Sequence, residues 1–172
     1  MKQIIKPAAS PAAVGPYNHA VRVGDLLFCS GQIPLDPATG QLVGGDIRVQ
    51  TERVLENVKA ILADQKLTFA HVVKATVFMT NLGDFAAMNE VYRTFWKADP
   101  PARTTVVSDF VVPGALLEIS AIAIPNGGER KVIHPSSWMK SPNPYSYGIK
   151  SGSTLFLAGL VSRNGKDNSV VE

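Results

Sequence analysis

The sequence predicts an α+β fold in which two helices cover one face of a mixed β-sheet. Two segments, residues 46–65 and 84–98, show the spacing of apolar residues that is typical of amphipathic helices. Short β-rich segments bounded by Gly and Pro lie on both sides of them, in the order ββ(β)αβαββ up to Pro125. Such an order is typical of a sheet with its helices gathered on one side.

The first two strands are expected within residues 19–31, on either side of a turn at Gly24 and Asp25. Glycine supplies the positive φ that tight hairpin turns require. A second turn is predicted in residues 34–43, where Pro and Gly interrupt the apolar pattern. We therefore expect a hairpin that leads, through this turn, into the first helix.

Both helices have a candidate N-cap, Asp46 in the first and Asp84 in the second. A β-rich segment at residues 71–80 separates the two helices and is predicted to be a strand. The apolar positions of the first helix are Ile47, Val54, Leu55, Val58, Ile61 and Leu62. The large residues of the second helix are interpreted as core residues; they are Phe85, Met88, Tyr92, Phe95 and Trp96.

The last two strands are predicted at residues 102–111 and 115–125, with a Pro-Gly turn between them. Two helices can cover only one face of a sheet. The other face also carries apolar residues, with Val77 and Ile119 among the candidates. We therefore expect this second face to bind further protein, which predicts oligomerisation.

The residues from about 132 onward are similar in sequence to the N-terminal residues of the chain. Tyr17 and Tyr145 lie 128 residues apart, and the same offset aligns the surrounding residues without a gap. Further identical pairs include Ile5 and Ile133, Pro7 and Pro135, Pro16 and Pro144, Gly24 and Gly152, Leu27 and Leu155, Phe28 and Phe156, and Gly31 and Gly159. We predict a first domain at 1–125, a linker at 126–131 and an incomplete second repeat at 132–172.

The composition argues against several classes of function. The chain is mildly basic, with a pI near 9.1, but it contains no run of Lys or Arg, so a nucleic-acid partner is not indicated. No apolar stretch approaches the ~20 residues that span a bilayer, and the N-terminus lacks the apolar segment of a signal peptide. The single cysteine, Cys29, cannot form an intramolecular disulfide. We expect a soluble cytoplasmic protein without a membrane partner.

Two charged residues inside apolar strands are the candidates for chemistry. Arg103 begins an apolar strand, where its guanidinium must pair or remain solvated, and its planar fork matches a carboxylate. Glu118 lies in the strand that follows, which we expect to be its neighbour in the sheet. One interpretation is a structural Arg–Glu pair without a substrate. The other is a site in which Arg103 binds a substrate carboxylate.

Other reactive side chains carry weaker indications. Cys29 follows Phe28 in a predicted strand and is interpreted as a small core residue rather than a nucleophile. The three histidines lack the spacing of metal ligands, so we expect no metal. Tyr17 is either a packing aromatic or a pocket wall, and Asn89 either lines a site or bonds backbone groups near the second helix.

The chain resembles the RidA/YjgF family of imine and enamine deaminases, which is also labelled endoribonuclease L-PSP. The resemblance covers the chain up to about Pro125. It is carried by the segments AAVGPYNHAVRVGDLLFCSGQIPLDPATG, TERVLENVKAIL, VVKATVFMTNLGDFAAMNEVY, PPARTTV and LEISAIAI. It implies a chorismate-mutase-like fold, a homotrimer with clefts between its subunits, and no cofactor.

The resemblance also implies roles for individual residues. The carboxylate-binding Arg of the family falls on Arg103, and its water-positioning Glu falls on Glu118. The substrate-binding positions fall on Tyr17, Ser30, Gly31, Asn89 and Thr105, the last standing where some relatives have Cys. The implied reaction is hydrolysis of 2-imino acids, such as 2-iminopropanoate and 2-iminobutanoate, to 2-keto acids and ammonia. An enamine such as 2-aminoacrylate would first tautomerise to the imine.

Two other functions remain open at this point. RNA binding or cleavage is a label that many relatives carry, but the sequence offers neither a basic groove nor an evident His or Lys acid–base pair. A non-catalytic binder would use Arg103 to capture carboxylate metabolites.

The second repeat is not expected to build a site of its own. It has no equivalent of Arg103 or Glu118, and Ser30 of the first copy corresponds to Ala158. Two explanations of this repeat stay open. The chain is a piece of a tandem two-domain protein, or the extra hairpin pairs with a sheet edge or covers an apolar face.

Overall fold

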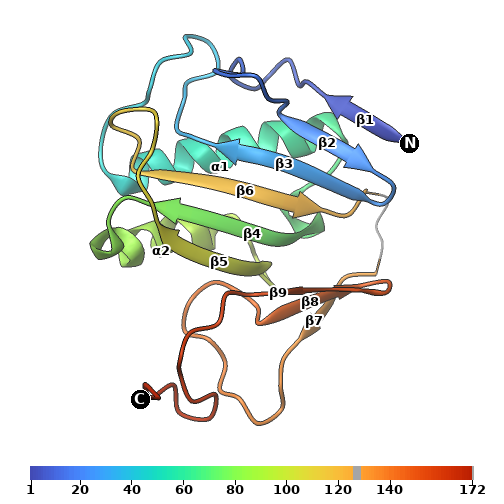
Figure 1. The fold of residues 1–172 in the computed structure, drawn as a ribbon, viewed down its shortest axis with the longest axis vertical. Helices are drawn as coiled ribbons and strands as arrows, with labels where there is room; N and C mark the ends of the chain where they lie inside the picture. The colour runs from blue at the N-terminus through green and yellow to red at the C-terminus, as the bar shows by residue number, and fades with distance from the viewer. Residues whose placement is uncertain (126–128, 172) are drawn as a thin grey trace.

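In the computed structural model, which describes residues 1–125 and 129–171, the main unit is a six-stranded mixed sheet with two helices on one face (Figure 1). The strand order is β1-β2-β3-β6-β4-β5, and β4 and β5 are the parallel pair. The strands are β1 (Lys2–Ile5), β2 (Ala20–Val23), β3 (Leu26–Gln32), β4 (Val72–Met79), β5 (Ala102–Val107) and β6 (Leu117–Ala123). The predicted α+β class is confirmed.

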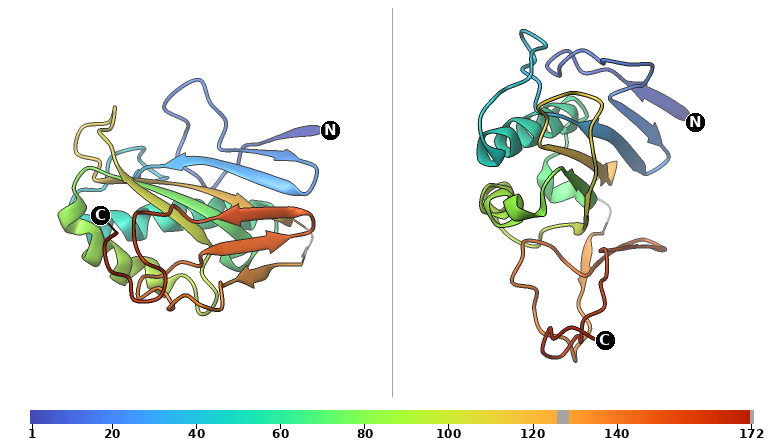
Figure 2. Two further views of the ribbon diagram at one scale, coloured as in Figure 1. Left: turned by 60° about the horizontal axis from the view of Figure 1, so that its bottom comes forward. Right: turned by 60° about the vertical axis from the view of Figure 1, so that its left-hand side comes forward.

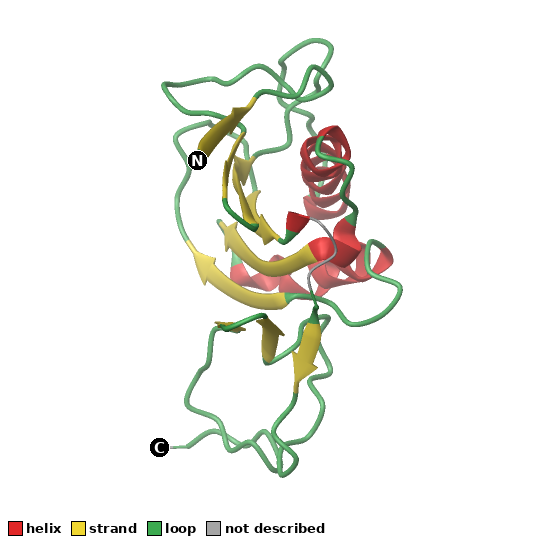
Figure 3. Cartoon of the chain, turned by 90° about the vertical axis from the view of Figure 1, so that its right-hand side faces the viewer, coloured by secondary structure: helices red, strands yellow, loops and turns green. Residues whose placement is uncertain are grey.

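Helices α1 (Ile47–Asp64) and α2 (Phe85–Thr94) lie side by side on the same face of the curved sheet (Figure 3). The predicted apolar face of α1 is confirmed, because all six of its residues are buried in the core. Full burial of a Val, Leu or Ile side chain stabilises a fold by roughly 1.5–3 kcal/mol. Packing of this stripe against the sheet therefore fixes the position of α1.

The two predicted N-caps differ in outcome. Asp46 caps α1 as expected, and its carboxylate accepts hydrogen bonds from the backbone N–H groups of Arg48 and Val49. Asp84 is at the start of α2, but its side chain makes no capping hydrogen bond, so that prediction is wrong. A short 3-10 helix, η2 (Leu82–Asp84), leads into α2, and its first turn is capped by Asn81 instead. A second 3-10 helix, η1 (Phe69–His71), precedes β4.

The sheet differs from the prediction in two respects. Strand β1 was not expected, because a Pro- and Ala-rich stretch follows it, yet it pairs with β2 at the edge of the sheet. Val77 and Ile119 were expected on the face away from the helices, and this is wrong. Both are buried in the core under the helices. Side chains alternate between the two faces of a strand, and these two positions fall on the face that the helices cover. The opposite face carries Phe28 and Ile122, which are paired across β3 and β6.

Residues 129–171 form a second body next to the β5 edge (Figure 2). It contains a three-stranded antiparallel sheet of β7 (Lys131–Ile133), β8 (Gly148–Ser151) and β9 (Thr154–Leu157). A small second core joins this sheet to the main unit, with buried residues Val73, Ala102, Ile124, Ile149 and Ala158. Of the predicted linker at 126–131, residues 126–128 lie outside the described part of the chain, and Lys131 already belongs to β7.

None of the helices in the described part of the chain has the length and apolar character needed to cross a membrane.

Candidate functional site

Arg103 lies on the edge strand β5 and points to the helix side of the sheet. It is paired with Ala75 of β4, and only 3% of its surface is exposed. Its guanidinium carbon lies 4.6 Å from the ring centre of Tyr92 and 5.5 Å from that of Phe85, both on α2. A third ring, that of Tyr145, lies at 5.8 Å and belongs to the second body, residues 129–171. Three aromatic rings therefore surround one buried cation.

The guanidinium of Arg103 has hydrogen-bonding capacity to spare. Within the described residues it forms no salt bridge, and its Nη1 atom is buried without a hydrogen-bond partner. Burial lowers the pKa of Arg103, because desolvation disfavours the charged form. A buried donor without an acceptor is costly. An anionic ligand that accepted this hydrogen bond would relieve the cost.

Glu118 does not pair with Arg103 within the chain, so the predicted Arg–Glu neighbourhood is wrong. Strand β4 lies between β5 and β6, although these two strands are consecutive in sequence. The neighbours of Glu118 along β6 are buried against the helices, so its own side chain points to the opposite face. The two charged residues thus belong to opposite faces of the sheet.

One pocket gathers four of the predicted site residues. It has a volume of about 320 Å³, and Tyr17, Ser30, Gly31 and Glu118 line it together with residues 110–112. Burial raises the pKa of Glu118, which favours its neutral form relative to an exposed carboxyl. Gly31 lies so close that an added Cβ would overlap the Glu118 carboxylate. Glycine at this position therefore makes room for the carboxylate.

A second pocket contains Arg103 and Thr105. It has a volume of about 430 Å³, and much of its wall comes from residues 139–168, including Tyr145, Gly159 and Arg163. No Asp or Glu lines it. It is therefore a cationic pocket without a carboxylate that could act as a base.

The remaining predicted residue, Asn89, lines neither of these pockets. It is buried, and its Nδ2 atom donates a hydrogen bond to Oδ1 of Asn143 at 3.2 Å. The contribution of Tyr145 to the Arg103 pocket was not predicted. The signal for it was present in the sequence, because Tyr145 is the counterpart of Tyr17 at the offset of 128 residues.

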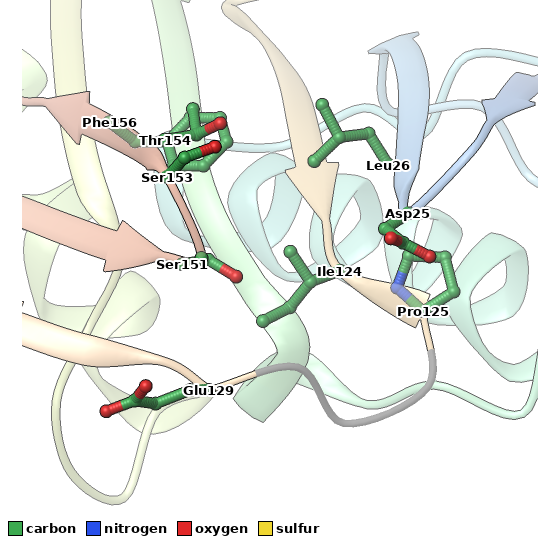
Figure 4. A pocket seen from close by; sticks show the side chains of 10 residues that line it. Asp25, Leu26, Ile124, Pro125, Glu129, Ser151, Ser153, Thr154 and Phe156 are labelled. Atoms are coloured by element: carbon green, nitrogen blue, oxygen red, sulfur yellow. The ribbon is translucent and has the colours of Figure 1, made fainter.

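A third pocket, of about 460 Å³, lies between the β2–β3 turn and the β8–β9 turn (Figure 4). Asp25 and Leu26 line it from one turn, and Ser153 and Thr154 line it from the other. It contains none of the predicted site residues. No group of three or more His, Cys, Asp or Glu side chains in the described part of the chain is placed to hold a metal ion.

Cys29 is buried in the core of the main unit, in agreement with its interpretation as a core residue. Burial raises the pKa of its thiol to about 12, so almost none of it is thiolate at neutral pH. We expect no reaction of the native protein with Ellman's reagent at pH 8, and one thiol per chain after unfolding in guanidinium chloride. Rapid labelling of the native protein would contradict this environment for Cys29.

Comparison with known proteins gives consistent relatives for the main unit. Residues 7–125 match the model of the family described as endoribonuclease L-PSP. Protein DfrA of Myxococcus xanthus is 50% identical over 125 residues, which cover 72% of this chain and 95% of that protein. A goat protein named 2-iminobutanoate/2-iminopropanoate deaminase is 40% identical over 124 residues, covering 72% of this chain and 90% of that one.

The fold is also found among solved structures. The crystal structure of Escherichia coli TdcF with bound serine is similar with a TM-score of 0.68 and 41% identity. The match covers 72% of this chain and 99% of the TdcF chain, so the relative consists of the main unit alone. The α+β fold of the main unit is the chorismate-mutase-like fold of these relatives. With its matched residues, sheet order and helices, the chain belongs to the RidA/YjgF family, the family of the endoribonuclease L-PSP model.

Proposed function

We propose that the protein is a deaminase that hydrolyses 2-imino acids, such as 2-iminopropanoate and 2-iminobutanoate, to 2-keto acids and ammonia. The observation that carries the proposal is the buried guanidinium of Arg103, whose Nη1 atom lacks a hydrogen-bond partner. Arg103 lines a pocket without acidic residues. Such a group matches the carboxylate that every 2-imino acid carries. The goat relative, a 2-iminobutanoate/2-iminopropanoate deaminase by name, supports the same reaction class.

The reaction asks little of the protein, because an imine carbon is already electrophilic. Arg103 holds the substrate carboxylate and thereby fixes the imine carbon. Glu118 accepts a proton from a water molecule while the water oxygen bonds to that carbon. The imine nitrogen takes up a proton from the solvent, which gives a carbinolamine. The carbinolamine hydroxyl then releases its proton to the solvent, and the C–N bond breaks as the nitrogen receives the proton held by Glu118. The products are a 2-keto acid and ammonia.

The proposed site is completed between chains. In one chain Arg103 and Glu118 line different pockets on opposite faces of the sheet. The wall formed by Tyr17, Ser30, Gly31 and Glu118 must therefore meet Arg103 of another copy. A homotrimer, which the family resemblance implies, would produce such sites between adjacent subunits. Thr105 would line the Arg103 side of the site, since it lies two residues further along β5 and lines the same pocket.

No cofactor takes part in the proposed reaction. Water is the co-substrate, and Arg103 and Glu118 supply the charges. We place the activity in the cytoplasm, where enamine and imine products of amino-acid dehydratases arise and where a chain with a single cysteine is typical.

The test couples a threonine dehydratase, which releases 2-iminobutanoate precursors, to the purified protein and follows imine decay. The full chain and a chain of residues 1–125 are assayed in parallel, because relatives such as TdcF consist of this unit alone. We expect imine decay to be faster than the uncatalysed rate with at least one of them. Decay at the uncatalysed rate with both chains would exclude the proposed reaction. Saturable binding of 2-oxobutanoate in that case would identify a carboxylate binder instead.

A further inference from the structure

The two related segments of the chain have the same backbone hydrogen bonds, not only the same residues. The bond from Ser30 N to His19 O recurs as the bond from Ala158 N to Tyr147 O. Other features recur at the same offset: the bridges Leu35–Leu42 and Arg163–Val170, the register pairs Ala20–Cys29 and Gly148–Leu157, and the positive φ of Gly24 and Gly152. Residues 131–171 therefore share the local backbone conformation of residues 3–43.

The second copy contributes backbone atoms to three hydrogen bonds with the β5 edge of its own chain, and side chains such as Asn143 and Ile149 add further contacts. Ser146 N–H donates to Pro101 O at 3.1 Å, and Gly159 N–H donates to Arg103 O at 3.0 Å. Lys74 Nζ donates to Leu157 O. Bonds of this kind depend on the shape of the backbone and hardly on side-chain identity. Any segment with the same backbone can therefore make them.

The first copy keeps two residues of this contact, and it lacks the side chains of Asn143 and Ser146, whose counterparts are Gly15 and Asn18. A side chain at Gly159 would press on Thr104, with an added Cβ only 3.0 Å from Thr104 Cγ2, and its counterpart Gly31 is also glycine. The counterpart of Tyr145, whose ring lies near Arg103, is Tyr17.

The contact face of the first copy is also available. Phe156 packs in the second core, and its counterpart Phe28 is 41% exposed, as is Tyr17. The first copy therefore has an open contact face that matches the β5 edge.

Equivalent residues of the two copies lie close together at the hairpin turns. The pocket of Figure 4 is lined by both hairpin turns, and Asp25 and Ser153, like Leu26 and Thr154, are equivalent positions. Equivalent residues meet near the axis of a rotation. The contact joins two different surfaces, the face around Tyr17 or Tyr145 and the edge around Arg103. A contact between different surfaces closes a ring when its rotation divides a full turn, and it builds an open filament when it does not.

We propose that residues 129–171 occupy, within their own chain, the β5 edge on which residues 3–43 of a second copy would otherwise bind, and so keep the chain out of a closed ring. The occupied Arg103 pocket contains Tyr145 and Gly159 but no carboxylate. A second copy would bring Glu118 together with Tyr17 and Gly31, since these line one pocket. The segment thus replaces a partner that carries a base with one that does not. The effect on turnover rests on the proposed function, whereas the effect on assembly does not.

The tether favours the segment in this competition. A segment attached within a few residues of β6 has an effective concentration of roughly millimolar, about a thousand times that of a second copy at micromolar concentration. Releasing residues 129–171 from the β5 edge therefore requires a mutation in this segment. Ile149 is the best position for the mutation, because this residue of β8 is fully buried in the second core.

The experiment compares the full chain with its Ile149→Arg variant by sedimentation velocity and by the imine assay. Leu155→Arg is the matched control, because Leu155 is on the same hairpin but is 49% exposed. We expect the wild type and Leu155→Arg to sediment as single chains of 18.4 kDa. Ile149→Arg is expected to form a ring of several chains at micromolar concentration, with turnover about tenfold higher or more.

A chain of residues 1–125 provides the second variant in case Ile149→Arg does not fold. It is expected to assemble in the same way, and an added peptide of residues 129–171 is expected to dissociate it. Assembly without imine turnover would support this inference and overturn the proposed function. A wild-type chain that already forms the ring, or a 1–125 chain that stays monomeric, would overturn the inference whatever the turnover.

Discussion

Replacing Arg103 by Met is expected to lower kcat/KM for 2-iminobutanoate by about a hundredfold or more. A charged hydrogen bond contributes roughly 1.5–3 kcal/mol, and the guanidinium fork can make two of them to a carboxylate. Arg103→Lys keeps the charge but loses the planar fork, so we expect it to recover only a small part of the activity. The measurement is the coupled imine assay with each variant, made in the chain of residues 1–125 and in the full chain.

The fold is expected to survive the Arg103→Met change. Met fills a space similar to that of the Arg side chain beside Tyr92 and Phe85, and it leaves no buried charge unpaired. The melting temperature should therefore equal or exceed that of the wild type. Arg48→Met is the control, because Arg48 is an exposed residue of α1 paired with Glu90, far from the pockets in the fold. Full activity in Arg103→Met would remove Arg103 from the site.

Replacing Glu118 by Gln is expected to lower kcat by about a hundredfold or more while leaving KM nearly unchanged. General acid–base catalysis typically contributes between about a hundredfold and ten-thousandfold. Gln has the same shape and keeps a polar side chain next to Gly31, but it cannot accept the proton from water. The substrate carboxylate is bound by Arg103, so binding should be affected little. Equal losses in kcat and in substrate affinity would indicate that Glu118 only positions the substrate.

The pH dependence provides a second readout for Glu118. Burial raises its pKa, so the active carboxylate form is lost as pH falls through a value above the usual range for Glu. We expect kcat of the wild type to fall on that acid side, and the Gln variant to lack this fall. If kcat of the Glu118→Gln variant falls at the same acidic pH as that of the wild type, the titrating group is not Glu118.

The effect of pH on the stability contributed by Glu118 is expected to run opposite to its effect on kcat. Because the folded protein favours the protonated carboxyl, the stabilisation from Glu118 is present below its unfolded pKa and is lost as pH rises through its folded pKa. At pH 7 the Gln variant is therefore expected to melt at the same or a higher temperature than the wild type. A calorimetric scan of both proteins at pH 4 and pH 7 measures the difference.

The helices were predictable because their signals are local. The apolar stripe from Val54 to Leu62 depends only on the 3.6-residue period, and the cap at Asp46 depends on atoms within three residues. Asp84 failed as a cap because a 3-10 turn precedes α2, and a pattern search does not distinguish that turn from a direct helix start.

Positions across the sheet were harder to predict because strand order is not chain order. Strands β5 and β6 are consecutive in sequence, but β4 separates them, so Arg103 and Glu118 are not on neighbouring strands. Alternation of side chains along each strand places the two residues on opposite faces. The face assignments of Val77 and Ile119 failed for a related reason. Alternation along a strand divides its residues between two faces, but only packing decides which face the helices cover.

The sequence by itself determined the fold class, the family and the residues that carry charge inside apolar strands, because these depend on composition, local periodicity and motifs. It also predicted that residues 132–172 repeat the beginning of the chain, because identity at a constant offset needs no coordinates. Only the tertiary structure decided that Arg103 and Glu118 line separate pockets, and that Tyr145 rather than Tyr17 lies beside Arg103. These are long-range contacts. The sequence shows that two similar segments exist, around Tyr17 and around Tyr145, but it does not show which of them packs beside Arg103.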